Sequence, residues 1–448
     1  MRSLKIYVIS LLSHYNVDIA YMSCRICVVF SHPSSDIPTW PYKGYDYEAR
    51  KKEIMDLLKK KLSDFDITFK TAMSSKDGES IVKEVSDVDG YIVYMLGIWV
   101  GAGYTIAGAG KPTILVDDLY CGSGELISTY AWAKSEELPV LAVASSDFED
   151  VVKALKLIKV VTLLKKSKII VVTDRDMRKT SETIKSSLGV EVLKVSSEKL
   201  NQYYREADLG EAEKWAEKWI REALRVIEPS RDEIIKAAKM YLAMKKLLEE
   251  EKAIAIAIDC LTLVYSNRLE AYPCLGFFQL NNEGLIGACE ADLSSTLAML
   301  IIRYLTGEPG FISDPVFDLS KSWIVYAHCV APSMVYGPNG PVNPYIIRSH
   351  AEDRSGASTQ SLMPLEEYVT TIQVNPFEKA MTIHIGKAVA NIDDEKACRT
   401  KLAVEVKADR ILENWRWGWH RVTFYGNWLS ELRNLARLMG FKVYEEDK

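Results

Sequence analysis

The sequence lacks any long uninterrupted run of apolar residues. No stretch approaches the roughly 18 consecutive apolar residues that a membrane-spanning helix requires. An excess of positive charge is also absent, since 56 Lys and Arg residues stand against 61 Asp and Glu residues. A nucleic-acid-binding surface is usually strongly basic. We therefore expect a globular protein whose partners include neither a membrane nor a nucleic acid.

A regular pattern of cysteines is lacking as well. The eight cysteines are scattered through apolar stretches, which favours buried, reduced thiols and a cytoplasmic location. Cys24 and Cys27 form a CxxC motif, but a single motif inside the strand-like run SCRICVVF is a weak signal for a metal or redox site. No small-residue cleavage site follows the first apolar stretch. We interpret residues 1–21 as an extension ahead of the first strand.

Strand and helix patterns alternate through the first two thirds of the chain. From Cys24 to Lys165, runs of Val, Ile and Leu are separated by amphipathic helical stretches, which is typical of a parallel sheet covered on both faces. A strand in SKIIVVTDRD opens a second α/β region, in which Ser230 and Glu233 form the capping box of a long helix. The runs AIAIAIDCL and LGFFQLNNEGLIGACE are predicted as further strands.

The last third of the chain has a different character. After TGEPG, short alternating runs such as TTIQVN, AMTIHIG, LAVEVK and HRVTFYG dominate, which is typical of antiparallel sheets. The predicted fold class is therefore α/β, with two doubly wound parallel-sheet (Rossmann-like) domains followed by a C-terminal, mainly antiparallel β-barrel domain. The expected boundaries are 1–164, 165–308 and 309–448.

A glycine-rich stretch, VGAGYTIAGAGKPTILVDD, invites comparison with dinucleotide-binding motifs. The spacing fails, because Ile106 follows Gly101 and Gly103 where the motif requires a third glycine. The second set of glycines fails at Thr113. We expect these small residues to pack a helix closely against the sheet instead.

Three polar residues stand at the ends of buried runs. LIGACE predicts a strand that ends on Glu290, and SWIVYAHC brings His328 near the end of another. GFISD predicts a strand that ends on Asp314, because Pro315 would interrupt the ladder. In open α/β sheets, residues at the carboxyl ends of strands face the functional crevice. These three side chains are therefore candidates for one site.

Two acids and a histidine in one buried site need a cation. An unpaired buried carboxylate costs several kcal/mol, and a divalent metal would satisfy the cluster. Mixed carboxylate and imidazole ligation favours Mn²⁺, with Fe²⁺, Co²⁺ and Zn²⁺ as alternatives. His350, His384 and His420 are candidates for a further ligand. His384 has the alternation of a packed strand residue, whereas His420 stands where a tryptophan-rich loop meets a strand.

Four segments resemble the L-fucose isomerase and L-arabinose isomerase superfamily in order and approximate spacing: GACEADLSSTLAMLIIRYLTGEPGFISD, VYAHCVAPS, ACRTKLAVEV and WGWHRVTFYGN. The resemblance implies that Glu290 and Asp314 bind Mn²⁺ and transfer protons, and that His420 is a metal ligand. His328 is similar to an additional histidine ligand of arabinose isomerases. Those enzymes carry glutamate where this chain has Ser313, so the acids are closer to those of fucose isomerases. The resemblance also implies a homo-oligomer with sites near subunit contacts.

The leading hypothesis is a metal-dependent aldose–ketose isomerase that acts on a fucose-like or arabinose-like sugar through an enediol. Glu290 and Asp314 would act as general base and acid, and the metal would stabilise the negative charge on the enediol oxygens. A noncatalytic sugar-binding or regulatory protein is the alternative. A glycoside hydrolase that uses the same acid pair without a metal is a third hypothesis.

Overall fold

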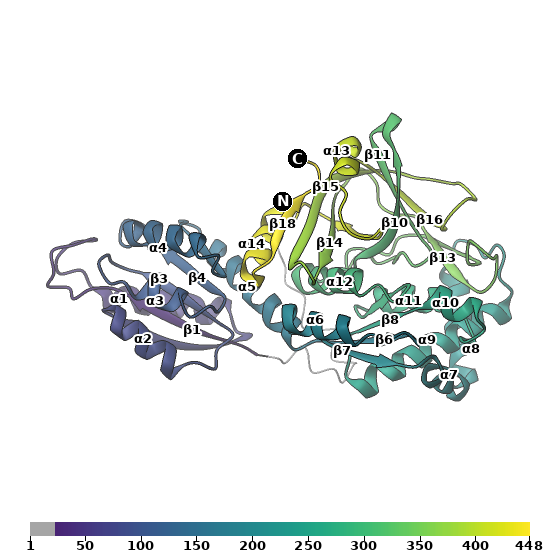
Figure 1. Ribbon diagram of the computed structural model, residues 1–448, viewed down its shortest axis with the longest axis horizontal. Helices are drawn as coiled ribbons and strands as arrows, with labels where there is room; N and C mark the ends of the chain where they lie inside the picture. Colours follow the sequence, from purple (N-terminus) through teal and green to yellow (C-terminus); the bar gives the residue numbers. More distant parts are fainter. Residues whose placement is uncertain (1–22) are drawn as a thin grey trace. The chain divides into compact units, whose positions relative to one another are not determined.

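The structure is a computed structural model in which residues 23–448 are described (Figure 1). The predicted extension, residues 1–21, lies outside this part. The described chain forms two compact units. The N-terminal unit holds the chain up to Leu163 together with Ser430–Lys442, and the main unit holds Leu164–Leu429 and Val443–Lys448. In the described chain, no helix combines the length and apolar character needed to span a bilayer.

The N-terminal unit contains a five-stranded parallel sheet with the order β2-β1-β3-β4-β5. Its strands are β1 (Cys24–Ser31), β2 (Phe65–Ala72), β3 (Gly90–Met95), β4 (Thr113–Asp117) and β5 (Val140–Val143). Its helices are α1 (Tyr47–Lys61), α2 (Ser75–Glu84), α3 (Ala102–Ala107), α4 (Ser123–Ser135), α5 (Phe148–Lys165) and, from the end of the chain, α14 (Leu429–Met439). Every residue of β3 is buried, as expected for a central strand covered on both faces. The predicted parallel sheet is confirmed.

The main unit begins with a four-stranded parallel sheet with the order β7-β6-β8-β9. Its strands are β6 (Lys168–Val172), β7 (Glu191–Val195), β8 (Ala255–Ile258) and β9 (Ile286–Ala288). Its helices are α6 (Arg178–Leu188), α7 (Ser197–Glu206), α8 (Leu209–Glu222), α9 (Arg231–Glu251), α10 (Cys260–Tyr265), α11 (Cys274–Asn282) and α12 (Leu293–Thr306). Ser230 caps α9 as predicted, since its side chain accepts a hydrogen bond from the backbone N–H of Glu233. That both α/β regions are Rossmann-like domains stays a prediction.

Helix α11 contradicts the predicted strand over LGFFQLNN. All nine of its residues are buried, so its sequence has no polar face to reveal a helical period. A short apolar run without periodicity fits a buried strand and a buried helix equally. The next strand, β9, packs tightly against this helix, because a Cβ at Gly287 would lie 2.8 Å from the Cα of Phe277.

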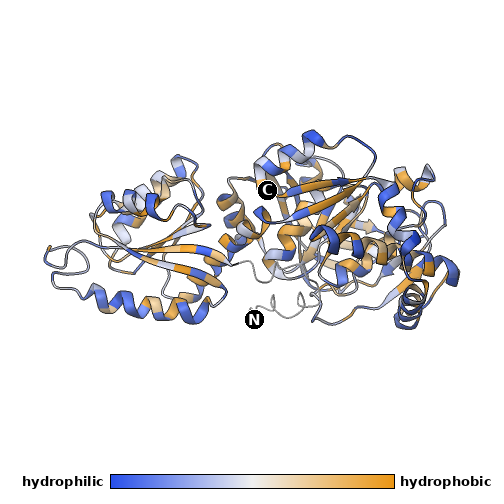
Figure 2. Ribbon diagram, turned by 90° about the horizontal axis from the view of Figure 1, so that it is seen from below, coloured by the Kyte–Doolittle hydropathy of each residue, from blue (hydrophilic) through white to orange (hydrophobic). Residues whose placement is uncertain are grey.

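A closed antiparallel barrel of six strands follows, in the order β14-β17-β10-β11-β16-β15, with β14 pairing β15 and β18 added beside β15. The strands are β10 (Phe311–Asp318), β11 (Trp323–His328), β14 (Tyr368–Asn375), β15 (Ala380–Asn391), β16 (Thr400–Glu405), β17 (Arg421–Tyr425) and β18 (Lys442–Glu445). A separate hairpin joins β12 (Tyr345–Arg348) to β13 (Ser358–Ser361), and α13 (Ala408–Glu413) is a short helix. The predicted C-terminal barrel is confirmed. In Figure 2, strands of the chain are coloured largely as hydrophobic.

Strand β10 does not end at Asp314, as the sequence suggested. It continues to Asp318 and includes Pro315. Its ladder with β17 stops at Ser313, and from Asp314 onward it pairs only with β11. At Pro315, β10 therefore has a hydrogen-bonded partner strand on one side only. A proline is tolerated there, because no partner on the open side requires its missing N–H.

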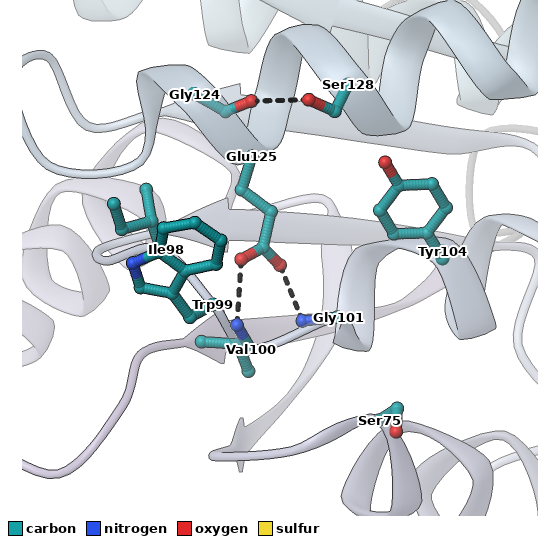
Figure 3. Close-up of a pocket in the computed structure, with 9 residues that line it drawn as sticks. All are labelled: Ser75, Ile98, Trp99, Val100, Gly101, Tyr104, Gly124, Glu125 and Ser128. Carbon is teal, nitrogen blue, oxygen red and sulfur yellow. Dashed lines mark hydrogen bonds between the residues drawn. The ribbon is translucent and has the colours of Figure 1, made fainter.

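The glycine-rich stretch lines a cavity of about 470 Å³ at the carboxyl ends of β3 and β4 (Figure 3). The buried carboxylate of Glu125 accepts hydrogen bonds from the backbone N–H groups of Val100, at 2.9 Å, and Gly101, at 2.8 Å. A phosphate would need such N–H groups, and here a side chain already occupies them. A Cβ at Gly103 would lie 2.7 Å from a methyl group of Met95. This close approach supports the packing role predicted for the glycines.

The CxxC motif is part of the core of the N-terminal unit. Cys24 contacts the hydroxyl of Thr162 in α5 at 3.5 Å, whereas Cys27 belongs to the apolar cluster that includes residues of α2, α3 and α4. Burial raises the pKa of the Cys27 thiol to about 12. Thiols held in this way are structural.

Candidate metal centre

Four side chains of the main unit converge where the barrel meets the parallel sheet. Glu290 follows β9, Asp314 lies in β10, His328 ends β11, and His420 immediately precedes β17. Strand β10 pairs with both β17 and β11. The first ladder brings His420 beside Asp314, and the second brings His328 beside it. Helix α12 connects β9 to β10 and so places Glu290 at the same end.

The polar atoms of these residues are close to one another. His420 Nε2 lies 3.1 Å from Asp314 Oδ1 and 3.5 Å from Glu290 Oε2. His328 Nε2 lies 3.9 Å from Glu290 Oε1. One ligand atom from each of Glu290, His328 and His420 lies within 4.8 Å of the others. Ligands that each lie about 2 Å from one ion have similar separations, so this group could hold a divalent metal.

Unpaired polar atoms at this centre favour a cation. Within residues 23–448, three buried atoms here make no hydrogen bond of acceptable geometry: His328 Nε2, and the pair Asp314 Oδ1 and His420 Nε2, which face each other at 3.1 Å. An unsatisfied buried polar group costs about 1–3 kcal/mol, and more if it is charged. All three atoms are electron-pair donors in the appropriate protonation state. A divalent ion would satisfy all three, so the residues present fit the metal that the sequence predicted.

Asp292 sets the orientation and tautomer of His420. Its Oδ2 lies 2.9 Å from His420 Nδ1, and it is partly buried beside the first turn of α12, which it also caps. In the neutral ring, Nδ1–H donates to this carboxylate, and Nε2 then has the lone pair that a metal ligand needs. A carboxylate behind a histidine is the usual support of a metal-binding imidazole.

His328 is held in a different way. The backbone N–H of Cys329 donates to its Nδ1 at 2.9 Å, so in this tautomer the neutral ring carries its proton on Nε2, facing Glu290. Metal ligation through Nε2 requires the other tautomer and therefore the loss of this bond. Burial lowers the pKa of His328 to about 4, which keeps the ring neutral, as ligation requires.

The pKa values of the other three residues are shifted in different directions. Burial raises the pKa of Glu290, and the negative charge of Asp314 adds to that effect. Burial alone would raise the pKa of Asp314, but the imidazole of His420 lowers it overall. For His420, burial would lower the pKa, yet Asp292 and Asp314 raise it to about 10. The centre thus pairs two carboxyl groups with opposite shifts, an arrangement found in acid–base sites.

The backbone at Glu290 is strained. Glu290 has φ +59° and Ala291 has φ +50°, and the left-handed region costs a non-glycine residue about 1–2 kcal/mol. The Glu290 N–H donates to Cys260 Sγ at 3.4 Å, and the Ala291 N–H donates to the Ile258 carbonyl at 2.8 Å. These bonds tie the turn to the end of β8. Strain of this kind concentrates at functional sites.

The two remaining candidate histidines do not join the group. His384 is buried between the Tyr326 hydroxyl, at 2.6 Å, and Glu446, at 2.9 Å, so the predicted structural role is confirmed. His350 Nδ1 instead lies 3.0 Å from Asp353 Oδ1.

Three neighbours of the centre were not recognised as such in the sequence. Asp292 caps α12, and that local role explains its presence without any link to His420. The Cys398 thiol donates to Asp314 Oδ2 at 3.9 Å, and the largely exposed Trp419 helps to lower the pKa of Asp314 against the effect of burial. The spacing of Asp292 two residues after Glu290 was the only available signal, and it does not indicate a contact with a residue 128 positions away.

Replacing Asp292 by Asn is expected to weaken divalent-metal binding by about 10- to 100-fold. The amide nitrogen of Asn can donate to His420 Nδ1, which would favour the tautomer that carries its proton on Nε2. Asparagine caps helices as well as aspartate does, so the thermal midpoint should change little. Titration of the protein with Mn²⁺ by calorimetry measures the effect. Asp318→Asn, at the end of β10 where Asp318 pairs with Lys321, is the control. Unchanged affinity in Asp292→Asn would refute the orienting role.

Comparison with known proteins gives a partial match. No protein-family model matches the chain. A sulfoquinovose isomerase from Priestia aryabhattai is 26% identical over 274 residues, which cover 59% of this chain and 60% of that protein. A protein of the same name from Clostridium sp. (strain MSTE9) is 29% identical over 185 residues, or 38% of this chain and 40% of that protein. The chain thus spans less than two thirds of the length of these relatives, and over that part it is similar to proteins named sulfoquinovose isomerase.

Proposed function

We propose that the protein is a divalent-metal-dependent aldose–ketose isomerase. The observation that carries this proposal is the convergence of Glu290, Asp314, His328 and His420, with three ligand atoms among them that make no hydrogen bond of acceptable geometry. The similarity to proteins named sulfoquinovose isomerase supports the same class of reaction. The proposed substrates are fucose-like or arabinose-like sugars, as the sequence suggests, or the sugar for which the relatives are named. The proposal also includes Mn²⁺ as the metal, a homo-oligomer with sites near subunit contacts, and a cytoplasmic location.

The four converging residues would hold the metal. When bound, a divalent ion polarises the sugar carbonyl and stabilises negative charge on the enediol oxygens. Asp292 holds the Nδ1 proton of His420, so that the neutral ring would offer Nε2 as the ligand atom. The strained turn at Glu290 directs its carboxylate toward both histidines.

The two carboxylates would carry out the proton transfer. Conversion of an aldose to a ketose moves one hydrogen from C2 to C1, and the bonding electrons of the C2–H bond form the enediol double bond. One carboxylate removes the proton from C2, and a carboxyl group returns a proton to C1. Glu290, with its raised pKa, and Asp314, with its lowered pKa, have the different proton affinities that such a pair needs. A bound cation would lower both values.

A panel of aldoses tests the proposal. We expect the purified protein to form ketose from L-fucose, L-arabinose or sulfoquinovose in the presence of Mn²⁺, and to lose that activity when a chelator removes the metal. Ketose formation can be followed by nuclear magnetic resonance. Sugar binding that a chelator does not affect, with no ketose formed, would instead establish the noncatalytic alternative. Release of sugar from a disaccharide without isomerisation would establish a glycoside hydrolase.

A further inference from the structure

A tryptophan is exposed at the open side of the candidate metal centre. Glu290 and Asp314 keep 26% and 25% of their side-chain surface exposed, whereas His328 and His420 are almost fully buried. The centre therefore meets the solvent on the side of its carboxylates. Trp419, the residue before His420, is 65% exposed. Its ring centroid lies 6.1 Å from that of His420, so an apolar surface lies directly beside the centre.

The loop before β17 carries three tryptophans at alternate positions, and the first two are packed. The guanidinium carbon of Arg421 lies 3.4 Å from the ring centroid of Trp415. The ring of Trp417 meets that of Tyr444 edge-on, with centroids 5.7 Å apart. The indole N–H groups of both donate hydrogen bonds, at 3.0 Å and 2.7 Å. Two rings thus fasten the loop, and the third, Trp419, is left largely in solvent.

We infer that Trp419 is a substrate-binding residue, whose indole ring stacks against the C–H groups of the sugar beyond C2. The inference deepens the proposed function and rests on it. The reacting carbons C1 and C2 must lie at Glu290 and Asp314. The remaining carbons then extend toward the open side, because the buried histidines close the other side. Trp419 lies at that open side.

A sugar suits such a ring. Its hydroxyl groups are polar, but its carbons present C–H groups that gain by leaving water. The face of an aromatic ring is electronegative, and it therefore attracts the weakly positive hydrogens of these groups. Sites for small molecules combine apolar or aromatic walls with a few polar groups that fix the orientation. The centre supplies the polar groups, and Trp419 supplies the wall.

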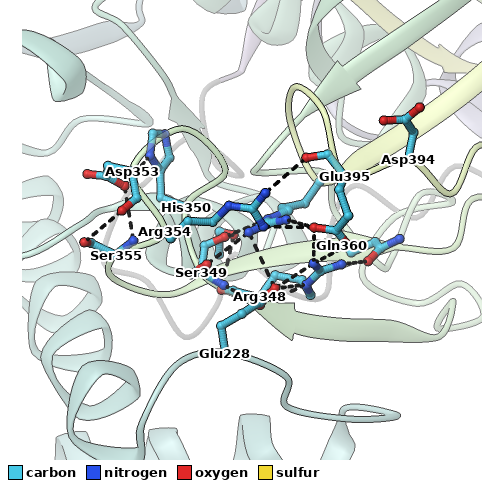
Figure 4. Close-up of polar contacts among 12 residues, drawn as sticks. Glu228, Arg348, Ser349, His350, Asp353, Arg354, Ser355, Gln360, Asp394 and Glu395 are labelled. Carbon is cyan, nitrogen blue, oxygen red and sulfur yellow. Dashed lines mark hydrogen bonds and ion pairs between the residues drawn. The ribbon is translucent and has the colours of Figure 1, made fainter.

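A group of arginines near the centre is already paired. The loop between β15 and β16 contacts the centre, and its Glu395 binds Arg348, Arg354 and Arg399 (Figure 4). The side chains of Arg348 and Arg399 are almost fully buried. A sugar would have to break these ion pairs to bind there. Covering the exposed ring of Trp419 displaces water instead.

Binding of an unreactive analogue tests the inference. L-fucitol and L-arabinitol, the alditols of two proposed substrates, have no carbonyl group and cannot isomerise. With Mn²⁺ present, calorimetry should give a dissociation constant about tenfold higher for Trp419→Ala than for the natural protein. Trp419→Phe should recover part of this loss, because a phenyl ring also stacks. In turnover, KM should rise about tenfold in Trp419→Ala, with a smaller change in kcat.

Two controls separate contact with the sugar from support of the fold. In Trp419→Ala, the thermal midpoint should stay the same, and the Mn²⁺ affinity should change much less than the alditol affinity. Tyr368→Ala is the matched variant, because Tyr368 is also largely exposed. It begins β14, which pairs there with the end of β17, whereas His420 precedes the start of β17. Tyr368→Ala should bind both alditols as the natural protein does.

Three outcomes would overturn the role of Trp419: no alditol binding by the natural protein, unchanged alditol affinity in Trp419→Ala, or a loss matched by an equal loss of Mn²⁺ affinity. Failure of the proposed function has a different result. Alditol binding that depends on Trp419, in a protein that forms no ketose, would uphold the sugar contact and count against the isomerase.

Discussion

Replacing Glu290 by Gln is expected to reduce ketose formation by about 10³-fold or more while the protein remains folded. Glutamine has nearly the same shape, but it cannot accept a proton as a general base and is a poor ligand for a divalent ion. The fold should survive, because burial and the nearby carboxylates of Asp314 and Glu352 raise the pKa of Glu290 although the charge of His420 opposes them. A neutral side chain is therefore tolerated at this position.

Activity is measured with the best sugar from the aldose panel, and folding by circular dichroism and the thermal midpoint. Glu249→Gln, on the exposed face of α9, is the control for the loss of one carboxylate and should retain full activity. Near-normal turnover in Glu290→Gln would end the catalytic assignment of Glu290.

Replacing Glu446 by Gln is expected to lower the free energy of unfolding by about 3–5 kcal/mol. Glu446 Oε1 lies 2.6 Å from Arg421 Nη2, and both side chains are completely buried. The variant would leave the Arg421 guanidinium buried without its counter-charge. Urea denaturation followed by tryptophan fluorescence measures the loss.

The same substitution should also affect the metal centre. The Arg421 guanidinium donates to the backbone carbonyls of Arg416, Trp417 and His420. It thereby holds the loop that ends on His420. We expect Glu446→Gln to weaken Mn²⁺ binding together with stability, whereas Asp176→Asn, which breaks an exposed ion pair with Arg178, should change neither. A stable Glu446→Gln variant would refute this anchoring role.

The pH dependence of stability follows from the Glu446 carboxylate. Burial alone would raise its pKa, but the hydrogen bond to His384 and the charge of Arg421 lower it overall. A group whose pKa is lower in the folded state contributes stability that is fully present above its unfolded pKa, about 4.3 for Glu, and is lost as the pH falls through the folded value. The natural protein should therefore lose more stability below about pH 4 than Glu446→Gln loses.

Local patterns were sufficient for most of the secondary structure. The alternation of apolar strands with amphipathic helices indicated the parallel sheets, and the short alternating runs after residue 310 indicated the barrel. Two expectations failed where the local signal is ambiguous. Helix α11 is buried on all sides, so its sequence shows no helical periodicity of apolar residues. Pro315 is tolerated within β10 because the pairing of β10 with β17 ends at Ser313.

The sequence by itself determined the kinds of side chain available for the centre and their positions near strand ends: Glu290, Asp314, His328 and His420. Only the tertiary structure decided that they meet, because closure of the barrel places β17 beside β10 although about a hundred residues separate them. The bond between Asp292 and His420 has the same origin. Strand order and register are set by the total packing of the core, so no local stretch of sequence contains them.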